Sequence, residues 1–416
     1  MRIGIVKIGE PVPGEGFRLR RVSRFAHALA ERGHQVTWWS SDWCHQSKTQ
    51  RSMDLLASCR EMGFSLRLLP AMRYYGNASP RRLVHHVQFA HRLSRALDDE
   101  SDTIDLLWIC FPTIPGALAA ARWARAHCKA HVFDVRDLSP DVFVERAPRA
   151  FRGALRAGLY PVRAWIGRSF AKASGLVAVS EGYLRWAVEL ADLGKGPPAD
   201  LAVLPLGYAK DAMKESESGR LLKELESAGL RPPPTLRVVY AGTLGSSYDL
   251  ETVIEASRLA DVAGLDLQVL IAGGGDQAGK IKAQAQRNPR VIYLGWLEPK
   301  TLQVLLENCD VGLLAYADGA TQGLPNKIFE YLGHGLLLAN ALRGEAADLV
   351  ERESLGWNYA PGDSDALVKI FEDVCSMADL SQRREANLRF YASKFGQDDL
   401  VADMVAFAER IAGGRR

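Results

Sequence analysis

Residues 322–333 combine the residue types that could bind a nucleotide diphosphate. A polar loop follows a strand-like run, and a helical pattern begins at Pro325 or Asn326. Proline suits the start of a helix, where free backbone amides can bind phosphate oxygens. Lys327 adds a full positive charge, and Glu330, three residues later on the same face, could accept hydrogen bonds from a ribose diol. The alternative is a solvent-exposed Lys–Glu pair, which the loop makes the weaker interpretation.

A second candidate is the glycine-containing loop 9–16 and the helix expected after it, over residues 17–32. Glycines allow a ligand to approach the backbone closely, and a helix start offers amides to an anion. Three arginines are expected in the first turn of this helix, where positive charge opposes the macrodipole. A phosphate would offset that conflict, although a tight turn with solvated arginines explains the pattern equally well. The residues concerned are Gly14, Gly16, Arg18, Arg20 and Arg21.

The segment 322–333 resembles the donor-binding motif of retaining glycosyltransferases with the GT-B fold, family four. That family has a Pro-x-Lys-x-x-Glu-Tyr segment, which implies that Lys327 binds the diphosphate and Glu330 the ribose. Four further segments, 239–244, 271–276, 294–296 and 361–367, resemble landmarks of the family in the same order. The resemblance implies that Lys327 is catalytic and that the donor also contacts Gln322, Gly323, Leu324, Pro325, Asn326, Glu330, Gly242, Thr243, Gly245, Gly273, Gly274, Gly295, Trp296 and Leu297.

The chain departs from the family pattern at two places. Gln322 stands where many members have an acidic residue near the transferred sugar. The loop 243–249 lacks the Arg and Lys that many members use to neutralise the leaving diphosphate. Lys327 would then carry that charge nearly alone within the second domain, with Arg18, Arg20 or Arg21 as possible helpers.

A third candidate, Asp137, follows a strand-like run in the first half of the chain. Its segment, 133–141, resembles the acceptor side of bacterial family members that assemble O-antigen, capsule or exopolysaccharide. Asp137 could orient the acceptor hydroxyl or accept its proton late in the reaction. The alternative is an Asp–Arg pair that caps the turn, and the pattern does not decide the roles of Asp134 and Arg136.

The stretch 146–172 reads as a basic amphipathic helix, because it contains no acidic residue between Glu145 and Glu181. At 100° per residue, four arginines share one stripe beside an apolar face, and Pro161 is expected to kink or divide the helix. Such a helix favours contact with an anionic membrane, and the alternative is packing on the sheet. The expected membrane contacts are Arg149, Arg152, Arg156, Arg163 and Trp165.

Short apolar runs alternate with helical patterns along the chain, which predicts an α/β fold of two doubly wound, Rossmann-like domains in the GT-B architecture. Strands are expected at 2–8, 35–40, 64–69, 105–110, 130–134, 175–179, 201–204, 236–241, 266–272, 291–294, 310–315 and 336–340. The polar helical stretch 216–230 and the prolines at 232–234 indicate a linker. The expected domains are an acceptor-side domain at 1–208, a nucleotide-sugar domain at 209–395, and a terminal helix at 396–416 that packs back on the first domain.

Charge and cysteine usage restrict the possible partners. Residues 1–208 carry 29 Lys and Arg against 19 Asp and Glu, whereas the remainder carries 23 against 30, so the first half is expected to meet an anionic partner. Six scattered cysteines without metal-ligand spacing favour a reducing compartment and no disulfide framework. Asp363 and Asp365 fit helix capping better than a metal site. We therefore expect no metal and no cofactor, and a cytoplasmic protein peripheral to the inner face of the membrane.

Together these features predict a retaining, metal-independent glycosyltransferase for cell-surface polysaccharide. It would move a sugar from a nucleotide diphosphate sugar, by analogy a uridine one, to a saccharide acceptor that is lipid-linked. Two alternatives remain open: a GT-B epimerase acting on the nucleotide sugar itself, and a non-catalytic basic adaptor for membrane or nucleic acid. The presence of both Lys327 and Glu330 speaks against the adaptor, and no nucleic-acid partner is expected.

Overall fold

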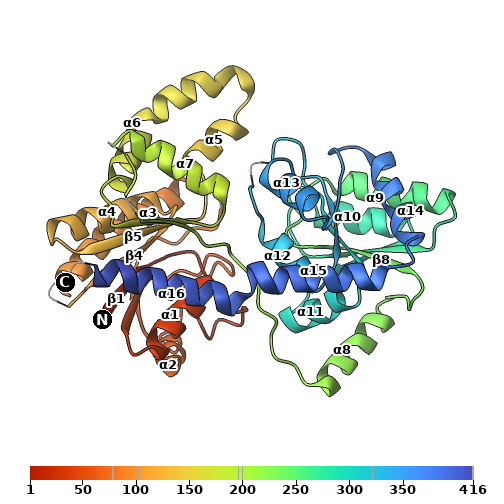
Figure 1. Cartoon of the computed structure of the whole chain (residues 1–416), viewed down its shortest axis with the longest axis horizontal. Helices are drawn as coiled ribbons and strands as arrows, with labels where there is room; N and C mark the ends of the chain where they lie inside the picture. Colours follow the sequence, from red (N-terminus) through yellow and green to blue (C-terminus); the bar gives the residue numbers. More distant parts are fainter. Residues whose placement is uncertain (77–78, 101–102, 195, 199, 321, 415–416) are drawn as a thin grey trace. The chain divides into compact units, whose positions relative to one another are not determined.

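The computed structural model describes residues 1–416 except 77–78, 101–102, 195, 199, 321 and 415–416 (Figure 1). The chain divides into two compact units, each built on its own parallel sheet. Unit 1 comprises Met1–Pro205 and Asp398–Arg416, and unit 2 comprises Leu206–Gln397. The predicted α/β class with two Rossmann-like domains is confirmed.

The sheet of unit 1 has the order β3-β2-β1-β4-β5-β6-β7. Its strands are β1 (Arg2–Val6), β2 (Gln35–Ser41), β3 (Ser65–Leu69), β4 (Leu106–Phe111), β5 (Ala130–Val135), β6 (Gly175–Ala178) and β7 (Asp200–Val203). The helices are α1 (Arg21–Glu31), α2 (Leu55–Glu61), α3 (Pro80–Asp98), α4 (Ile114–Ala126), α5 (Asp141–Arg146), α6 (Arg152–Phe170), α7 (Glu181–Asp192) and α16 (Gln397–Gly413), with a 3-10 turn at Arg149–Phe151.

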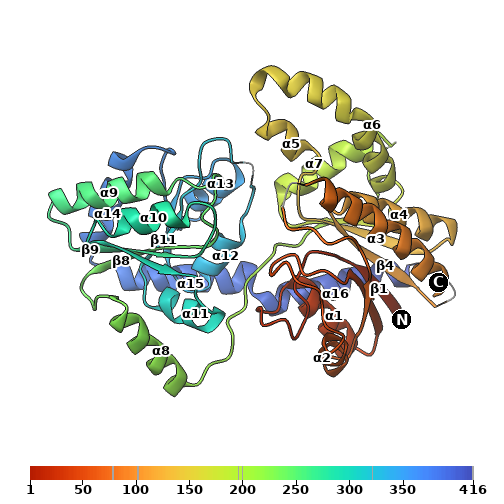
Figure 2. The same cartoon turned by 180° about the vertical axis from the view of Figure 1, so that it is seen from behind.

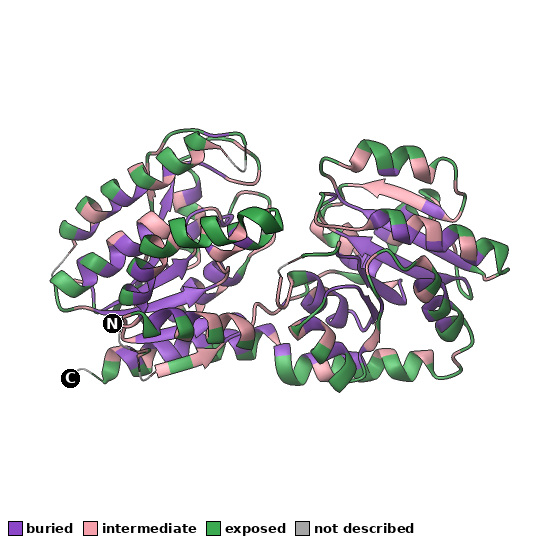
Figure 3. Cartoon of the chain, turned by 90° about the horizontal axis from the view of Figure 1, so that it is seen from above, coloured by how far each residue is buried: buried purple, intermediate pink, exposed green. Residues whose placement is uncertain are grey.

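Both faces of this sheet are buried, which explains its continuously apolar strands. Along β4, alternate residues enter two different cores: Trp108 packs with Phe25 of α1 and Phe407 of α16, whereas Phe111 packs with Phe170 of α6. The inner strands accordingly appear buried along most of their length in Figure 3, whereas the edge strands β3 and β7 are mostly exposed or half-buried.

The sheet of unit 2 has the order β10-β9-β8-β11-β12-β13. Its strands are β8 (Leu236–Ala241), β9 (Leu267–Ala272), β10 (Val291–Gly295), β11 (Val311–Leu314), β12 (Leu337–Asn340) and β13 (Gly356–Asn358). The helices are α8 (Glu215–Ser227), α9 (Leu250–Val262), α10 (Ala278–Ala285), α11 (Pro299–Glu307), α12 (Asn326–Leu332), α13 (Glu345–Arg352), α14 (Ser364–Cys375) and α15 (Leu380–Phe395).

Three local expectations were wrong. The stretch 216–230 is not a linker, because Leu221 and Leu225 of α8 are buried in the core of unit 2. Helix α1 begins at Arg21, so Arg18 and Arg20 precede it instead of lying in its first turn. Strand β13 was not predicted, since its three residues form only an edge of the sheet.

Helix α6 differs from the predicted basic stripe. It runs through Pro161 without a break, and Arg149 lies in the 3-10 turn before it. Only its second half packs on the unit: Ile166 and Phe170 are buried, whereas no described side chain of residues 152–163 is. Figures 1 and 2 both show the first half of α6, with α5, extending away from the sheet.

Candidate functional site

The candidate donor site lies where β8 and β11 end, at the centre of the sheet of unit 2. The strand order reverses here, because β8 connects onward to β9 on one side while β11 lies on its other side. Open parallel sheets bind ligands in the crevice outside the carboxyl ends of such strands. The short helix α12, which follows the loop after β11, carries Lys327 to this point.

The ammonium group of Lys327 is surrounded by three tyrosine rings. Its Nζ lies 3.9 Å from the ring centroid of Tyr248, 4.5 Å from that of Tyr240 and 5.5 Å from that of Tyr316. Nζ also donates to the Tyr240 hydroxyl at 3.1 Å. Cation–π contacts of this kind stabilise a charge that burial would otherwise disfavour. We call these four residues the lysine cage.

Burial dominates the electrostatics of the lysine cage. Lys327 is 7% exposed. Burial lowers the pKa of Lys327 to about 7, and the nearby Glu330 carboxylate opposes this effect. Near neutral pH the residue is therefore only partly protonated, and an anion brought next to Nζ would favour the charged form.

Glycine backbones form the wall beside the lysine cage. A Cβ on Gly242 would lie 2.8 Å from Cε of Lys327, so only glycine leaves room for this side chain. A Cβ on Gly273 would lie 1.8 Å from the carbonyl oxygen of Gly242, because the loops after β8 and β9 touch backbone to backbone. The Gly273 amide donates in turn to the Gly295 carbonyl at 2.7 Å. Predicted donor residues from three strands are thus neighbours in the fold.

Helix α12 is anchored to β8 by Tyr331, one turn after Lys327. The Ala241 amide donates to the Tyr331 hydroxyl at 2.9 Å, and the Tyr331 ring packs closely on Gly312 of β11. Pro325 is the residue just before the helix, as predicted to within one position. This anchoring fixes the position of Lys327.

The other predicted donor residues lie around this edge with varied exposure. Glu330 is half-buried one turn after Lys327, and Trp296 is 69% exposed just beyond β10. Gln322 is partly buried, and its Oε1 has no hydrogen-bond partner among the described residues. Asn326, Thr243, Gly245, Gly274, Gly323, Leu324 and Leu297 lie in the same loops and are exposed or half-buried.

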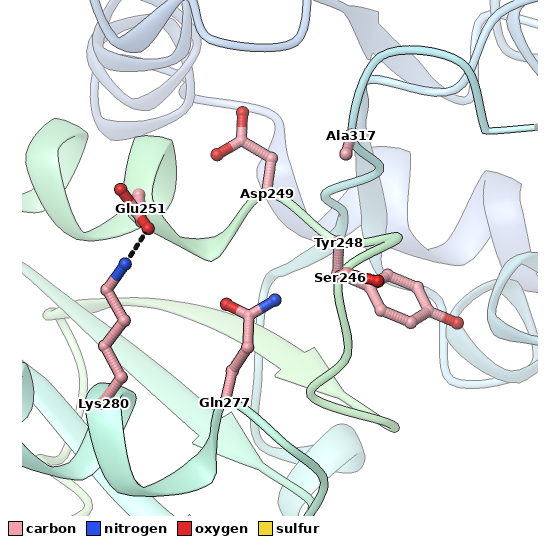
Figure 4. Close-up of a pocket in the computed structure, with 7 residues that line it drawn as sticks. All are labelled: Ser246, Tyr248, Asp249, Glu251, Gln277, Lys280 and Ala317. Carbon is pink, nitrogen blue, oxygen red and sulfur yellow. Dashed lines mark hydrogen bonds and ion pairs between the residues drawn. The ribbon is translucent and has the colours of Figure 1, made fainter. Parts of the chain in front are cut away.

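An open pocket of about 420 Å³ adjoins the cage through Tyr248 (Figure 4). In the close-up, Lys280 forms an ion pair with Glu251. Asp249 caps α9 by accepting from the Thr252 amide, and Gln277 donates to the Gly245 carbonyl at 2.7 Å. The pocket lining includes neither Lys327 nor Glu330, so we do not assign the donor to it.

The candidate acceptor residues belong to unit 1. Asp137 is half-buried after β5, and its Oδ1 accepts from the Ser139 hydroxyl at 2.7 Å. The Asp–Arg pair that the sequence left open is formed: Arg136 donates to Asp134 Oδ2 at 2.8 and 2.9 Å. Arg136 also pairs with Glu10 at 2.7 Å.

Sequence reasoning missed the buried network that shapes the N-terminal loop. Glu10 accepts from the Val22 amide at 2.8 Å, and Arg51 donates to the Glu10 carbonyl at 2.7 Å and to Glu15 at 3.0 Å. Arg21, predicted to meet a phosphate, is buried and lies 3.5 Å from Asp134. Arg20 is exposed and Arg18 half-buried, while Gly14 and Gly16 have positive φ angles of 91° and 74°.

Asp363 accepts from the Ala366 amide at 2.8 Å and caps α14, which confirms the capping interpretation of this Asp-x-Asp. Within the described ranges, no group of three His, Cys, Asp or Glu side chains is placed to hold a metal ion. No described helix is long and apolar enough to cross a membrane.

Two family models match the chain. The model for Glycosyltransferase Family 4 covers residues 20–209, and that for Glycosyl transferases group 1 covers residues 235–376. The chain belongs to the glycosyltransferases that these two models describe. The family that the motifs indicated is thereby confirmed.

Curated relatives of this glycosyltransferase match in part. The amylovoran biosynthesis glycosyltransferase of Erwinia amylovora is 27% identical over 141 residues, 32% of this chain and 35% of that protein. The putative colanic acid biosynthesis glycosyltransferase of Escherichia coli K12 is 24% identical over 171 residues, 39% of this chain and 42% of that protein. The alignments thus span well under half the length of these relatives.

Among solved structures, Anabaena HepE in complex with UDP-glucose superposes with a TM-score of 0.65 at 16% identity, covering 98% of this chain and 99% of that one. Sucrose-phosphate synthase from Thermosynechococcus elongatus gives a TM-score of 0.67 at 14% identity, covering 99% of both chains. At such identities the likeness establishes the shared fold.

Proposed function

We propose that this chain transfers a sugar from a uridine diphosphate sugar to a lipid-linked saccharide acceptor during assembly of a bacterial cell-surface polysaccharide. The observation that carries the proposal is the lysine cage at the carboxyl edge of unit 2. The names of the curated relatives and the UDP-glucose bound to Anabaena HepE support the reaction class and the nucleotide.

In this proposal Lys327 stabilises the diphosphate as it leaves. Charge that develops on the leaving group is stabilised best by a donor already fixed in a water-poor site. Tyr331 and Gly242 fix Lys327 in that way. The loop 243–249 supplies no second cation, so the share carried by Lys327 is large.

Three further groups have proposed roles in the reaction. Glu330 accepts from the ribose hydroxyls, and the unpartnered Oε1 of Gln322 accepts from a hydroxyl of the transferred sugar. Asp137 orients the acceptor hydroxyl and takes its proton. The sugar keeps its anomeric configuration, as in the retaining members of the family that the motifs resemble.

The deciding experiment measures UDP binding by calorimetry and transfer from radiolabelled UDP-sugars to a lipid extract. Wild type is expected to bind UDP and Lys327→Met to lose most of that affinity, whereas Lys280→Met, in the adjoining pocket, is expected to bind normally. If the protein converts the UDP-sugar to an epimer in the absence of an acceptor, its reaction is epimerisation and the proposed transfer is refuted. Absence of UDP binding would refute the donor site itself.

We also propose that the first half of α6 lies on an anionic membrane. Phe151 in the turn before α6, Tyr160 in its first half and Trp165 just after that half are 65%, 57% and 57% exposed. Arg149 and Arg156 are exposed beside them, but Arg152 donates to the carbonyls of Glu145 and Ala147, and Arg163 pairs with Asp141. The contact therefore rests on two of the four predicted arginines and on the aromatic rings.

Sedimentation with vesicles that contain anionic lipid tests this contact. Each basic residue near such a surface contributes about 1 kcal/mol, screened by salt. Arg149→Glu with Arg156→Glu should release the protein at low salt, whereas the matched pair Arg122→Glu with Arg125→Glu on α4 should not. Equal sedimentation of both double variants would show that α6 does not touch the membrane.

A further inference from the structure

A cluster of basic and aromatic side chains lies at the carboxyl ends of β2 and β3, outside the residues discussed so far. It consists of His45, Lys48, Tyr74, Arg82, His85 and His86, which we call the His45 cluster. Nδ1 of His45 lies 2.8 Å from the Tyr74 hydroxyl and 3.2 Å from Nζ of Lys48.

The Tyr74 ring is the centre of the His45 cluster. Nζ of Lys48 lies 5.1 Å from its centroid and the Arg82 guanidinium 5.9 Å, while the His85 ring meets it edge-on at 5.0 Å. The rings of His85 and His86 are 5.9 Å apart. Side chains from two loops and from the start of α3 thus converge on one buried ring.

The charges acting on His45 are all positive. Burial, followed by Lys48, Arg82, His85 and Lys7, lowers the pKa of His45 to about 4. Burial, followed by Arg82, His85 and His45, lowers the pKa of His86 to about 4. Near neutral pH these two histidines are therefore uncharged, and the positive charges that an anion would relieve are those of Lys48 and Arg82.

Negative groups contribute little within the cluster. Burial lowers the pKa of His85, and the hydrogen bond to the Met72 carbonyl at 2.8 Å and the Asp42 charge raise it without reversing the shift. Asp42 itself accepts from Gln50 at 2.8 Å and from the Ala71 amide at 3.0 Å. The Cys44 thiol raises the pKa of Lys48, which burial and Arg82 nevertheless lower.

The cluster is reachable from solvent. His45, Lys48, Arg82 and His86 are each half-buried, so the cluster reaches the surface of the unit, although Nε of Arg82 is buried. Beside them the Tyr75 ring is 64% exposed and stands edge-on to the buried Trp43 at 5.6 Å. A flat apolar ring next to a cationic cluster suits a ligand with a sugar beside an anionic group.

The cluster also borders the loop after β1. Gln46 donates to the Gly9 carbonyl at 2.9 Å, so loops from β1, β2 and β3 meet at this edge. Lys48 has a φ angle of 57°, an unusual conformation for a lysine and one found often at binding sites. The position is the ligand-binding edge of a parallel sheet.

We propose that the His45 cluster binds a phosphate or diphosphate group carried by the acceptor, with the adjoining sugar against Tyr75. The inference rests on the proposed transferase function, and it adds that the acceptor of the transferase carries a phosphate or diphosphate group. Lysine offers a point charge, arginine a fork of donors, and imidazole a further N–H, which together match the several oxygens of a phosphate. The source can be a water-soluble sugar phosphate or a lipid-linked diphosphate.

The test uses the full chain and inorganic pyrophosphate as the probe, followed by the NMR signals of the histidine rings. Assignment comes from His45→Gln and His86→Gln. Millimolar pyrophosphate is expected to move the His45 and His86 signals toward the protonated form. Arg82→Gln and Lys48→Ala should weaken that response at least tenfold, whereas Arg81→Gln, an exposed neighbour on α3, and Lys327→Met should leave it unchanged.

The source is separated with vesicles that carry a polyprenyl diphosphate or the corresponding polyprenyl alcohol, and with glucose 1-phosphate in solution. If the histidine signals respond only to the vesicles that carry the polyprenyl diphosphate, the anion belongs to a lipid-linked acceptor. If they respond to glucose 1-phosphate, the acceptor is a water-soluble sugar phosphate. With a working acceptor, Arg82→Gln should raise its KM at least tenfold and leave the KM of the UDP-sugar unchanged.

The two proposals fail separately. If His45 and His86 do not respond to pyrophosphate while UDP still binds in a Lys327-dependent way, the anion site is refuted and the donor site stands. If the histidines respond as expected but UDP does not bind and no sugar is transferred, the anion site stands and the transferase proposal is refuted.

Discussion

The ammonium of Lys327 lies 3.9 Å from the centre of the Tyr248 ring, at the carboxyl edge of the sheet of unit 2. The tyrosines give this lone charge a partner while keeping water away. This arrangement makes the donor site sensitive to pH, because burial lowers the pKa of Lys327 to about 7.

We predict that UDP affinity falls as the pH rises from 6.5 to 8.5. Below about pH 7 Lys327 is protonated and attracts the diphosphate, and above it the free protein must first take up a proton. The loss approaches tenfold per pH unit. Calorimetry in buffers of different ionisation enthalpy should show proton uptake above pH 7, and Lys327→Met should show neither effect. A flat affinity in wild type would mean that Lys327 is charged throughout.

The tyrosine rings should affect this profile according to their distance from Nζ. A cation–π contact in a water-poor site contributes about 0.5–2 kcal/mol. Tyr248→Leu therefore moves the fall in UDP affinity to lower pH, and Tyr316→Leu, whose ring is 5.5 Å away, moves it less. Equal profiles for both variants and wild type would exclude a role of the rings in holding the charge.

The proposed contact between Glu330 and the ribose can be detected with donors that lack one ribose hydroxyl. Loss of a charged hydrogen bond costs about 1.5–3 kcal/mol, so Glu330→Ala should lower kcat/KM at least roughly tenfold. A donor lacking one ribose hydroxyl should be much worse than the natural donor for wild type and nearly equal to it for Glu330→Ala. Lys327→Ala should penalise both donors alike. Equal discrimination by all three proteins would place the ribose elsewhere.

Turnover should not require a divalent metal ion, since Lys327 supplies the charge that a metal would otherwise provide. Full activity in EDTA, with no stimulation by Mg²⁺ or Mn²⁺, is the expected result. Loss of activity in EDTA that either ion restores would contradict it and would direct attention to Asp363 and Asp365.

Asp134 should contribute to the free energy of unfolding. Burial alone would raise its pKa, but Arg136 and Arg21 outweigh burial and hold the pKa below its usual range. The ionised carboxylate is thus favoured in the fold, and its contribution to stability is present at neutral pH and lost only in acid. Asp134→Ala removes the carboxylate that faces Arg21 and leaves Arg136 with Glu10 alone, and the loss of this buried partner should cost about 3–5 kcal/mol. Urea unfolding of this variant and of exposed Asp192→Ala would measure the difference.

The sequence predicted most of the strands, because apolar runs and the glycine loops that follow them are local signals. Gly242, Gly273 and Gly295 could be assigned from their motifs, and the fold then explains why they touch. The lysine cage could not be predicted in this way. Tyr240 and Tyr248 are close in sequence, but Tyr316 and Lys327 follow them by more than sixty residues and meet them only because β8 and β11 are neighbours.

Partnerships over long sequence distances account for the other differences. Arg21 has the positive charge expected of a phosphate-binding residue. In the fold, however, this charge faces the carboxylate of Asp134, which is more than a hundred residues away in sequence. Likewise, the stripe predicted on α6 treated Arg152 and Arg163 as free, whereas both have partners near α5. His85 and Tyr74 lie in different segments, and their contact depends on the loop after β3.

Helix α16 makes the first unit discontinuous in the chain. Met404 and Phe407 of this helix are buried in the same core as Trp108 of β4, although nearly three hundred residues separate them in sequence. During synthesis, the sheet of the first unit emerges from the ribosome long before the helix that covers one of its faces. The first unit therefore completes its core only after the second has been made, and a fragment ending at Pro205 would expose an apolar face to water.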